Sequence, residues 1–266
     1  MLSSTLQPAV SGSCPSKTPL LVFLHGLLGS GEDWNECIEH LPNFHKLMID
    51  LPGHGESRFV DSEGFEPTCQ MLEQTILCQI GQIGLAANHP VVVIGYSLGG
   101  RLAMYSLANG YLDKLNLVKL IVEGGNFGLE SEEEKAQRLV NDTKWAIRFA
   151  QQPIDEVLSD WYQQSVFSSL NHEQRQTLVL KRSGNLGVSV ASMLLSTSLA
   201  KQPDLRATLS TYQHLIHYIC GKKDRKFIDL ATLSGFEFSE IDFAGHNVHF
   251  EQPEQFSDVI KKQSNV

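Results

Sequence analysis

Ser97 stands in Gly95-Tyr96-Ser97-Leu98-Gly99, which fits the pattern G-x-S-x-G. The motif follows the apolar run 91–95 and precedes a helical pattern, so it has the strand–turn–helix context that holds a reactive serine on a strained turn. A hydroxyl in this position becomes a nucleophile or a base once a neighbour accepts its proton. We therefore predict Ser97 as the reactive residue. The alternative is an ordinary helix N-cap serine, which would not need glycine on both sides.

A histidine and an acid must follow the serine, at the ends of later strands. We predict His246, in the sequence AGHNVHF, because it lies in a glycine-containing turn after the last strand-like run. The rival His249 begins the apolar side of the next helix and is expected to be packed. For the acid we predict Asp224, which follows the run HLIHYIC by a short polar turn. Glu123, at the end of KLIVE, is the alternative, and Asp224 could also be a solvated turn residue.

Two backbone N–H groups are predicted to form an oxyanion hole beside Ser97. One is the N–H of Leu98, at the start of the helix after the serine, where the helix dipole helps. The other is that of Leu27 in the turn HGLLGSGEDW, where Gly26 allows the backbone to approach closely. A structural turn would use the same glycines, so the second assignment depends on the first.

Short apolar runs alternate with helical patterns along most of the chain. The helical patterns cover Gly31 to His40, Thr68 to Leu85 and Gly99 to Asn109. This alternation predicts an α/β fold with a mostly parallel sheet flanked by helices, whose ligand site lies at the carboxyl ends of the strands. Residues up to about Pro19 are polar and are expected to be frayed. The predicted strands are 20–24, 46–50, 91–95, 119–123, 214–220 and the weaker 238–245.

The alternation stops between Phe127 and Arg206, where only helical patterns occur. Ser131 followed by Glu134 is a capping-box start, and Pro153 opens a second helix at a position that proline tolerates. Roughly eighty residues without a strand are long for one crossover. We therefore predict that 127–206 is an inserted helical cap, with 1–126 and 207–266 forming the core. Ordinary crossover helices are the alternative.

Composition and charge restrict the class of protein. The chain has 266 residues, of which 42% are hydrophobic and 19% charged, and a net charge of −9. These values are typical of a globular protein and disfavour a nucleic-acid or anionic-membrane partner. We predict no signal peptide and no membrane span. An anionic substrate would need a local cluster of arginine.

Cysteine usage points to the compartment. The five cysteines are scattered and include no CxxC, which disfavours a disulfide framework or a zinc site and favours a reducing cytoplasm. We predict a cytoplasmic monomer or weak homo-oligomer without a metal. The cysteines are Cys14, Cys37, Cys69, Cys78 and Cys220.

Taken together, LVFLHG, IDLPGHGES, GYSLGG, the strand-end aspartate and the late GH resemble the α/β-hydrolase superfamily from about Leu20 onward. The stretches GYSLGGRLAM, IVEGGNFGL, DWYQQSVFSSLN, TSLAKQPDLR, CGKKDRKF and AGHNVHFEQP resemble one member family in both core and cap, the 2-succinyl-6-hydroxy-2,4-cyclohexadiene-1-carboxylate synthases of menaquinone biosynthesis. The resemblance implies a lyase that eliminates pyruvate from a small polyanionic ring, without acyl-enzyme, metal or organic cofactor. Ser97, activated by His246 and Asp224, would be the base.

The same resemblance implies a set of substrate-binding residues. Tyr96 and Trp161 would line the pocket, and the arginines would bind carboxylates through their bidentate forks. The alternative for each arginine is a solvated helix face, and for Trp161 it is packing within the cap. The family often has further basic residues near Arg138, where this chain has Lys135 and Val140. The arginines are Arg101, Arg138 and Arg182.

Three functions from different classes are compatible with these residues. They are the carbon–oxygen lyase, a serine hydrolase acting on an ester, thioester or carbon–carbon bond, and a non-catalytic binding protein that keeps the fold. The intact serine, aspartate and histidine disfavour the third. The arginines separate the first two, because an apolar esterase pocket would bury such charges at high cost.

Overall fold

A seven-stranded sheet forms the centre of the molecule in the computed structural model, which describes residues 1–10 and 18–264. Cys14 therefore lies outside the described residues. The strand order is β1-β3-β2-β4-β5-β6-β7; β1 pairs with β3 in the antiparallel sense, and all other neighbours are parallel. The strands are β1 Ser4–Gln7, β2 Leu20–Leu24, β3 Lys46–Ile49, β4 Pro90–Tyr96, β5 Asn116–Glu123, β6 Ile216–Gly221 and β7 Glu237–Ile241. The predicted mostly parallel sheet is confirmed.

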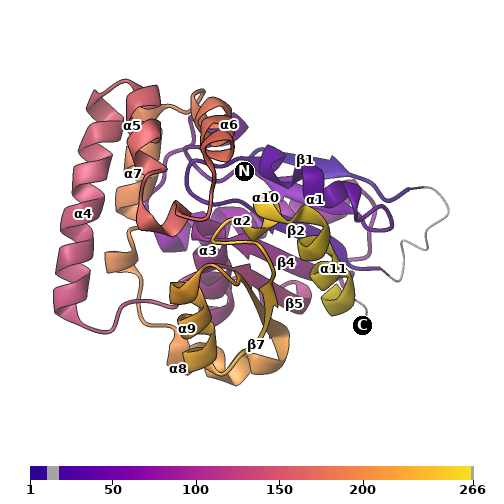
Figure 1. The fold of residues 1–266 in the computed structure, drawn as a ribbon. Helices are drawn as coiled ribbons and strands as arrows, with labels where there is room; N and C mark the ends of the chain where they lie inside the picture. Colours follow the sequence, from indigo (N-terminus) through magenta and orange to yellow (C-terminus); the bar gives the residue numbers. More distant parts are fainter. Residues whose placement is uncertain (11–17, 265–266) are drawn as a thin grey trace.

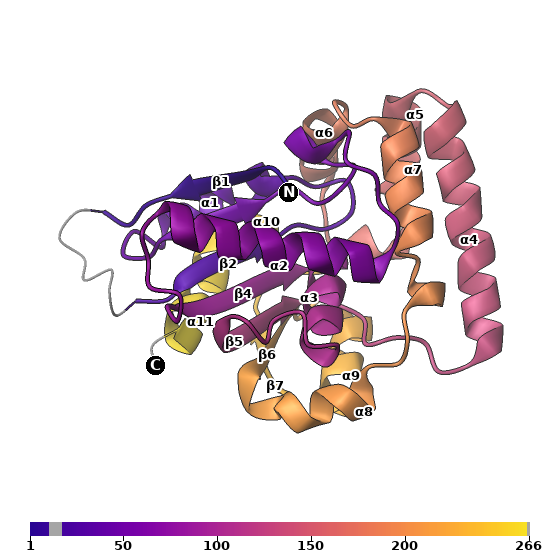
Figure 2. The ribbon, with the colours of Figure 1, turned by 180° about the vertical axis from the view of Figure 1, so that it is seen from behind.

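Helices cover both faces of this sheet, because alternate apolar side chains of its strands point to opposite sides. In β2 the side chains of Leu20, Val22 and Leu24 join a cluster with α2, α3 and α9. Leu21 and Phe23 join a second cluster with α1 and α11. Figures 1 and 2 show these two layers from opposite sides. The helices are η1 Gly31–Trp34, α1 Asn35–Glu39, η2 Gly55–Ser57, α2 Phe65–Gln82, α3 Leu98–Ala108, α8 Arg206–Leu209, η5 Ser210–Leu215, α9 Arg225–Ser234, α10 Val248–Glu251 and α11 Pro253–Ser264.

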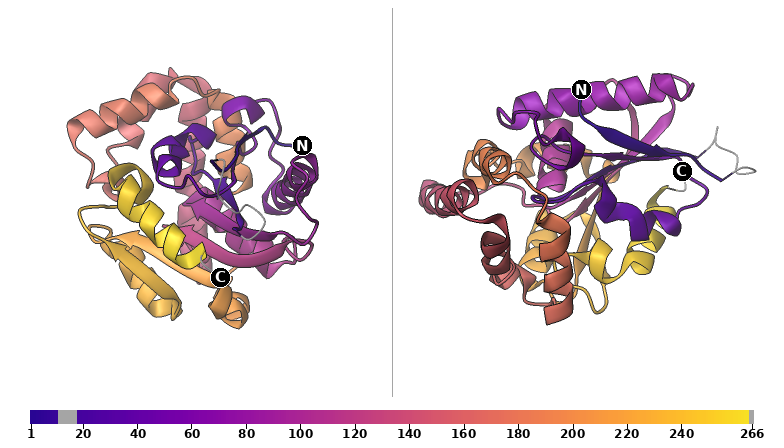
Figure 3. Two further views of the ribbon diagram at one scale, coloured as in Figure 1. Left: turned by 90° about the vertical axis from the view of Figure 1, so that its right-hand side faces the viewer. Right: turned by 90° about the horizontal axis from the view of Figure 1, so that it is seen from above.

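The chain between β5 and β6 contributes no strand to the sheet, and we call residues 127–206 of it the helical segment. Its main helices lie together beyond one end of the sheet (Figures 1 and 3). The predicted capping box is present: Ser131 Oγ accepts the N–H of Glu134 at 3.1 Å, and Glu134 Oε2 accepts that of Ser131 at 3.2 Å. Pro153 is the N-cap of α5. The elements are α4 Glu132–Gln151, α5 Ile154–Trp161, η3 Ser165–Phe167, α6 His172–Arg182, α7 Gly187–Ser196 and η4 Leu199–Lys201.

The helical segment has an apolar cluster that is separate from the two clusters of the sheet. Phe149, Val157, Leu158 and Val190 are among its buried residues. Leu28, from the turn after β2, is buried in this cluster, and Leu27 and Phe250 pack against it from the same core. The division into a core and a cap stays a prediction.

The frayed N-terminus that we predicted is wrong for residues 4–7, which form the edge strand β1. Ser4 pairs with Ile49 and Gln7 with Lys46. An antiparallel edge strand with one face toward water can be polar, so a four-residue strand of this kind has no apolar run to reveal it. Within the described residues, no helix is long and apolar enough to cross a membrane.

Candidate active site

Ser97 lies on a strained turn between β4 and α3. Its φ of 48° and ψ of −104° are unusual for a residue with a side chain. A Cβ on Gly95 would lie 2.6 Å from the carbonyl carbon of Gly99, and one on Gly99 would lie 2.2 Å from the carbonyl oxygen of Leu24. Both positions therefore require glycine, as the motif predicts. Ser97 is partly exposed while Tyr96 and Leu98 on either side are buried, so its hydroxyl can be reached.

His246 and Asp224 meet at the same end of the sheet. His246 Nδ1 lies 2.8 Å from Asp224 Oδ2, and both side chains are less than a tenth exposed. Asp224 follows β6, and His246 lies in the turn after β7. The imidazole also packs on the ring of Phe227, with centroids 4.6 Å apart. The structure thus joins the acid and the histidine that the sequence predicts.

The end of β5 lies between this pair and Ser97. The Ser97 N–H donates to the Glu123 carbonyl at 2.8 Å. The next residue is Gly124, where a Cβ would lie 2.7 Å from Cε1 of His246. Within the described residues the Ser97 hydroxyl forms no hydrogen bond, and the end of β5 contacts both the serine backbone and the imidazole. Catalytic hydrogen bonds are often loose before the substrate binds.

The two rival residues, Glu123 and His249, are bonded to each other. His249 Nδ1 lies 2.9 and 2.8 Å from the two carboxylate oxygens, and the His249 N–H donates to Oε1 at 3.1 Å. Both side chains are buried, and the rings of Trp34 and Tyr96 pack on His249. The expectation that His249 is packed is confirmed. The pair joins the end of β5 to α10, the helix that follows the turn of His246.

The turn after β2 packs directly on Ser97. The Gly29 N–H donates to the Gly26 carbonyl at 3.0 Å, which closes the turn around Leu27 and Leu28. A Cβ on Gly26 would lie 2.7 Å from the Tyr96 ring and 3.6 Å from Ser97 Cβ. In the part of the chain that the structure describes, neither the Leu27 nor the Leu98 N–H has a hydrogen-bond partner. Both are therefore available to a ligand at the serine.

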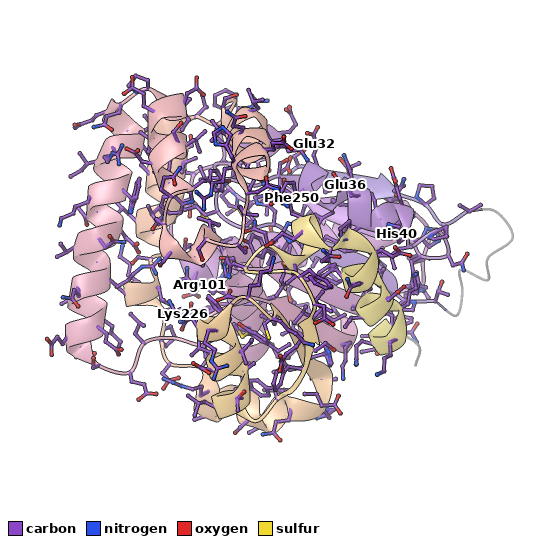
Figure 4. All side chains as sticks on the ribbon, in the orientation of Figure 1. Glu32, Glu36, His40, Arg101, Lys226 and Phe250 are labelled. Carbon is purple, nitrogen blue, oxygen red and sulfur yellow. The ribbon has the colours of Figure 1, made fainter. Side chains whose placement is uncertain are left out.

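Arg101 is a buried cation on α3, one helical turn after Ser97. Its Nε donates to Gln202 Oε1 and its Nη2 to the Thr197 carbonyl, each at 2.6 Å, where α3 meets the helical segment (Figure 4). Across residues 1–10 and 18–264 no carboxylate forms an ion pair with it. Burial, and then the charge of Arg138, lower the pKa of Arg101 to about 9. The charge of Asp142 acts against this lowering, but its carboxylate bonds Arg138 and Ser198, so a bound carboxylate would be the direct partner that Arg101 lacks among the described residues.

Arg182 differs, because its two terminal nitrogens are already taken. They donate to the carboxylate of Asp33 at 2.5 and 2.7 Å, and both side chains are buried. Although burial opposes the charges, Asp33 holds the pKa of Arg182 above its usual value, and Arg182 holds that of Asp33 below. The pair joins α6 to η1. Sequence reasoning missed Asp33, whose only signal is that of a capping box with Ser30.

Arg138, Trp161 and Tyr96 each have contacts within the protein. Arg138 Nε donates to Asp142 Oδ1 at 2.8 Å, one turn further along α4. Trp161 packs edge-on against Trp145 with centroids 5.0 Å apart, which is the packing alternative. The Tyr96 ring lies 5.3 Å from that of His246, and burial followed by the charge of Glu123 raises the pKa of the Tyr96 hydroxyl. Their contacts with a substrate stay predictions.

Comparison with known proteins gives a family and close relatives. The alpha/beta hydrolase family matches residues 21–259. A 2-succinyl-6-hydroxy-2,4-cyclohexadiene-1-carboxylate synthase of Pectobacterium atrosepticum is 41% identical over 243 residues, which are 91% of this chain and 92% of the relative. One from Escherichia coli is 42% identical over 238 residues, 88% and 89% of the two chains.

Solved structures show the same fold. MenH from S. aureus superimposes with a TM-score of 0.84 at 25% identity, and all of both chains is covered. A thermophilic esterase from Thermogutta terrifontis has a TM-score of 0.74 at 21% identity, covering 98% of this chain and 92% of the esterase. The second likeness concerns the fold alone.

Proposed function

The chain belongs to the alpha/beta hydrolase family and, within it, to the 2-succinyl-6-hydroxy-2,4-cyclohexadiene-1-carboxylate synthases, and we propose that it catalyses the pyruvate elimination which that name implies. The substrate would be 2-succinyl-5-enolpyruvyl-6-hydroxy-3-cyclohexene-1-carboxylate, and the step one of menaquinone biosynthesis. The observation that carries the proposal is a buried guanidinium without a carboxylate, Arg101, one turn from a serine on a strained elbow. A serine hydrolase needs only the elbow.

The proposed reaction begins with a proton transfer at the ring carbon next to the succinyl ketone. Ser97 gives its proton to His246, and its oxygen takes the ring proton. The electron pair forms a double bond to the next ring carbon, the existing ring double bond shifts, and the bond from the ring to the enolpyruvyl oxygen breaks. The enolate of pyruvate leaves and takes up, on carbon, the proton that His246 received, directly or through water, which gives pyruvate and returns His246 to its neutral form. The ring is left as the cyclohexadiene.

Negative charge develops on the ketone oxygen during this step. We propose that the free N–H groups of Leu27 and Leu98 bind that oxygen, since fixed donors at a developing oxyanion are a large source of rate enhancement. Asp224 would hold the His246 ring and stabilise the imidazolium that forms, because it already lies 2.8 Å from Nδ1. This arrangement supports a proton abstraction as well as it would an ester cleavage.

The substrate's carboxylates need cations, and we propose different parts for the three arginines. Arg101 would take a carboxylate as its countercharge, because burial without one is costly. Arg182 would keep its terminal nitrogens on Asp33 and bind a substrate carboxylate through its Nε, which has no hydrogen-bond partner among the described residues. Arg138 would contribute from α4, and Tyr96 and Trp161 would line the pocket. The partner is thus a small polyanion, and we keep a cytoplasmic location and a monomer or weak homo-oligomer as predictions.

The experiment that tests this function measures pyruvate released from the enolpyruvyl substrate, followed with lactate dehydrogenase. We expect turnover by the wild type and a fall in kcat of about 10³-fold or more in Ser97→Ala, since removal of a triad member leaves only oxyanion and binding effects. Ser159→Ala, on the exposed face of α5, is the matched control and should keep full activity. Cleavage of p-nitrophenyl esters without pyruvate release would reject the lyase.

A serine hydrolase is the second candidate, and one observation favours it. The strained serine, the Asp224–His246 bond and the two free N–H groups together suffice for acyl transfer. A serine hydrolase, however, does not explain why Arg101 is buried beside the serine.

A further inference from the structure

Two buried imidazoles that the proposed reaction does not use lie behind the Leu27 turn. His25 follows β2, and His54 lies in the loop after β3. Both are fully buried, and their ring centroids are 5.3 Å apart. A buried polar ring needs a structural or functional reason, because an unsatisfied one is costly. Here all four ring nitrogens have partners.

The two rings link the two loops in a reciprocal way. His25 Nε2 accepts the N–H of Leu51 at 2.9 Å, and His54 Nε2 accepts the N–H of Leu28 at 2.9 Å. Each histidine thus reaches from its own loop to the backbone of the other. The Nδ1 atoms bond carbonyls of their own loops, Gly26 at 2.7 Å and Pro52 at 2.9 Å.

These partners fix the charge and the tautomer of both rings. A backbone N–H can only donate, so each Nε2 must be an unprotonated acceptor and each Nδ1 must carry the proton. Burial acts in the same direction, lowering the pKa of His25 to about 4 and that of His54 to about 3. Both rings are therefore neutral near pH 7 and keep one hydrogen-bonding pattern.

The bond from His54 falls on the strained residue of the turn. Leu28 has a φ of 70°, in the left-handed region that favours glycine. Its N–H is held by His54, and its carbonyl accepts Nδ2 of Asn185 from the helical segment at 2.9 Å. The Leu27 N–H shares a peptide plane with the Gly26 carbonyl, which Gly29 and His25 hold, and the next peptide carries the Leu28 N–H, which His54 holds. With the peptides on both sides of Leu27 fixed, its φ and ψ cannot change, and the Leu27 N–H keeps its direction. Without these contacts the turn could relax to an unstrained conformation.

We infer that His54 is a positioning residue of the oxyanion hole: through Leu28 it keeps the Leu27 N–H aimed at the oxygen that gains charge beside Ser97. His25 supports the same turn from within its own loop: its Nδ1 donates to the Gly26 carbonyl, and its Nε2 accepts the Leu51 N–H of the loop after β3. The inference rests on the proposed function in that it takes Leu27 as an oxyanion donor. A buried histidine that does not touch the substrate would thus contribute to kcat.

The test compares two amide replacements of the same ring. In His54→Gln the side-chain oxygen reaches the place of Nε2 and can accept from Leu28; in His54→Asn the shorter amide stays near Nδ1 and can only keep the Pro52 bond. We expect His54→Asn to lower kcat for pyruvate release about 10- to 100-fold with little change in KM, as for the weakening of one oxyanion donor. His54→Gln should restore kcat to within about threefold.

A merely structural histidine would not separate the two variants in this way. Equal kcat values for the folded Asn and Gln variants, or a change in KM alone, would overturn the inference. Hydrogen exchange of the Leu28 amide, measured in both variants, gives a readout besides activity: it should be fast in His54→Asn and protected in His54→Gln. Equal exchange would also contradict the inference, whatever the activities are.

The proposed function is tested separately, by the activity of the wild type. If the wild type releases no pyruvate but cleaves p-nitrophenyl acetate, the lyase is rejected, and the same Asn-to-Gln ratio of kcat is then measured for the ester. That ratio still tests His54, because ester cleavage uses the same oxyanion donors.

Discussion

The strand-end site and the helical segment hold their functional side chains by different means. At the strand ends the backbone does so: Gly95 and Gly99 permit contacts that no other residue allows, and Ser97 is fixed by the turn between them. In the helical segment, pairs of side chains such as Arg182 and Asp33 hold the functional groups in place. A position that is fixed by backbone contacts leaves glycines in the sequence, whereas one that is fixed by a distant partner leaves no local trace.

The two buried arginines show the same contrast chemically. Arg101 lies on a core helix and, in the part of the chain that the structure describes, bonds only neutral groups, while Arg182 is neutralised by Asp33. Both are arginines with little exposure, and the family resemblance treats them alike. Only their partners show that Arg182 bonds a carboxylate directly, whereas Arg101, among the described residues, does not.

The largest effect should come from breaking the elbow with Gly99→Ala. The new Cβ would meet the Leu24 carbonyl oxygen at 2.2 Å, so the strand and helix must separate. We expect a loss of about 3 kcal/mol or more in the free energy of unfolding, measured in urea. Gly81→Ala in α2, where nothing lies within 4 Å, is the control and should be neutral or stabilising by up to about 1 kcal/mol. Equal losses in both would contradict the backbone explanation.

Asp33→Asn should come next, because it leaves Arg182 buried without its countercharge. We expect about 3 kcal/mol of destabilisation, since breaking one partner of a buried pair typically costs that much. The exposed counterpart is Asp160, which pairs with Arg148 at 2.6 Å; Asp160→Asn should cost less than about 1 kcal/mol. The two free energies of unfolding are compared in urea. Losses of the same size would mean that Arg182 does not depend on Asp33.

Arg101→Gln sharpens the contrast between the arginines through binding. Removing a charge-assisted contact should raise KM for the enolpyruvyl substrate about 10- to 100-fold and change kcat little. Arg148→Gln, at a partly exposed arginine of the helical segment, is the control and should leave KM unchanged. Steady-state kinetics of pyruvate release measure both. An unchanged KM in Arg101→Gln would mean that no substrate carboxylate binds to Arg101.

The smallest effect, counted per pH unit, concerns the two buried histidines. Their pKa values are lowered to about 4 and about 3, so between pH 6.5 and about 4 the unfolded chain binds protons that the native state does not. Stability is therefore complete above pH 6.5 and falls as the pH drops, with each histidine contributing about 1.4 kcal/mol per pH unit. In His54→Gln the free energy of unfolding, measured in urea, should fall less steeply with decreasing pH, by the contribution of one histidine. An unchanged slope would mean that His54 is charged in the native state.

The sequence allowed most of the strand-end site to be predicted, and the reasons are physical. Ser97, Asp224 and His246 follow strand-like runs or glycine turns, and parallel strands bring such ends together. Pairs such as Glu123 with His249 and Arg182 with Asp33 join residues 126 and 149 positions apart. No periodicity connects partners at such separations, so only the folded chain shows them.

The most direct test of the elimination compares two products in one reaction. Elimination must form one conjugated cyclohexadiene for each pyruvate released. Hydrolysis of the enol ether at the same site would release pyruvate and leave the ring without a new double bond. Ultraviolet absorbance of the diene and enzymatic assay of pyruvate are followed together. We predict a one-to-one rise of the two; pyruvate without the diene would contradict the proposed lyase.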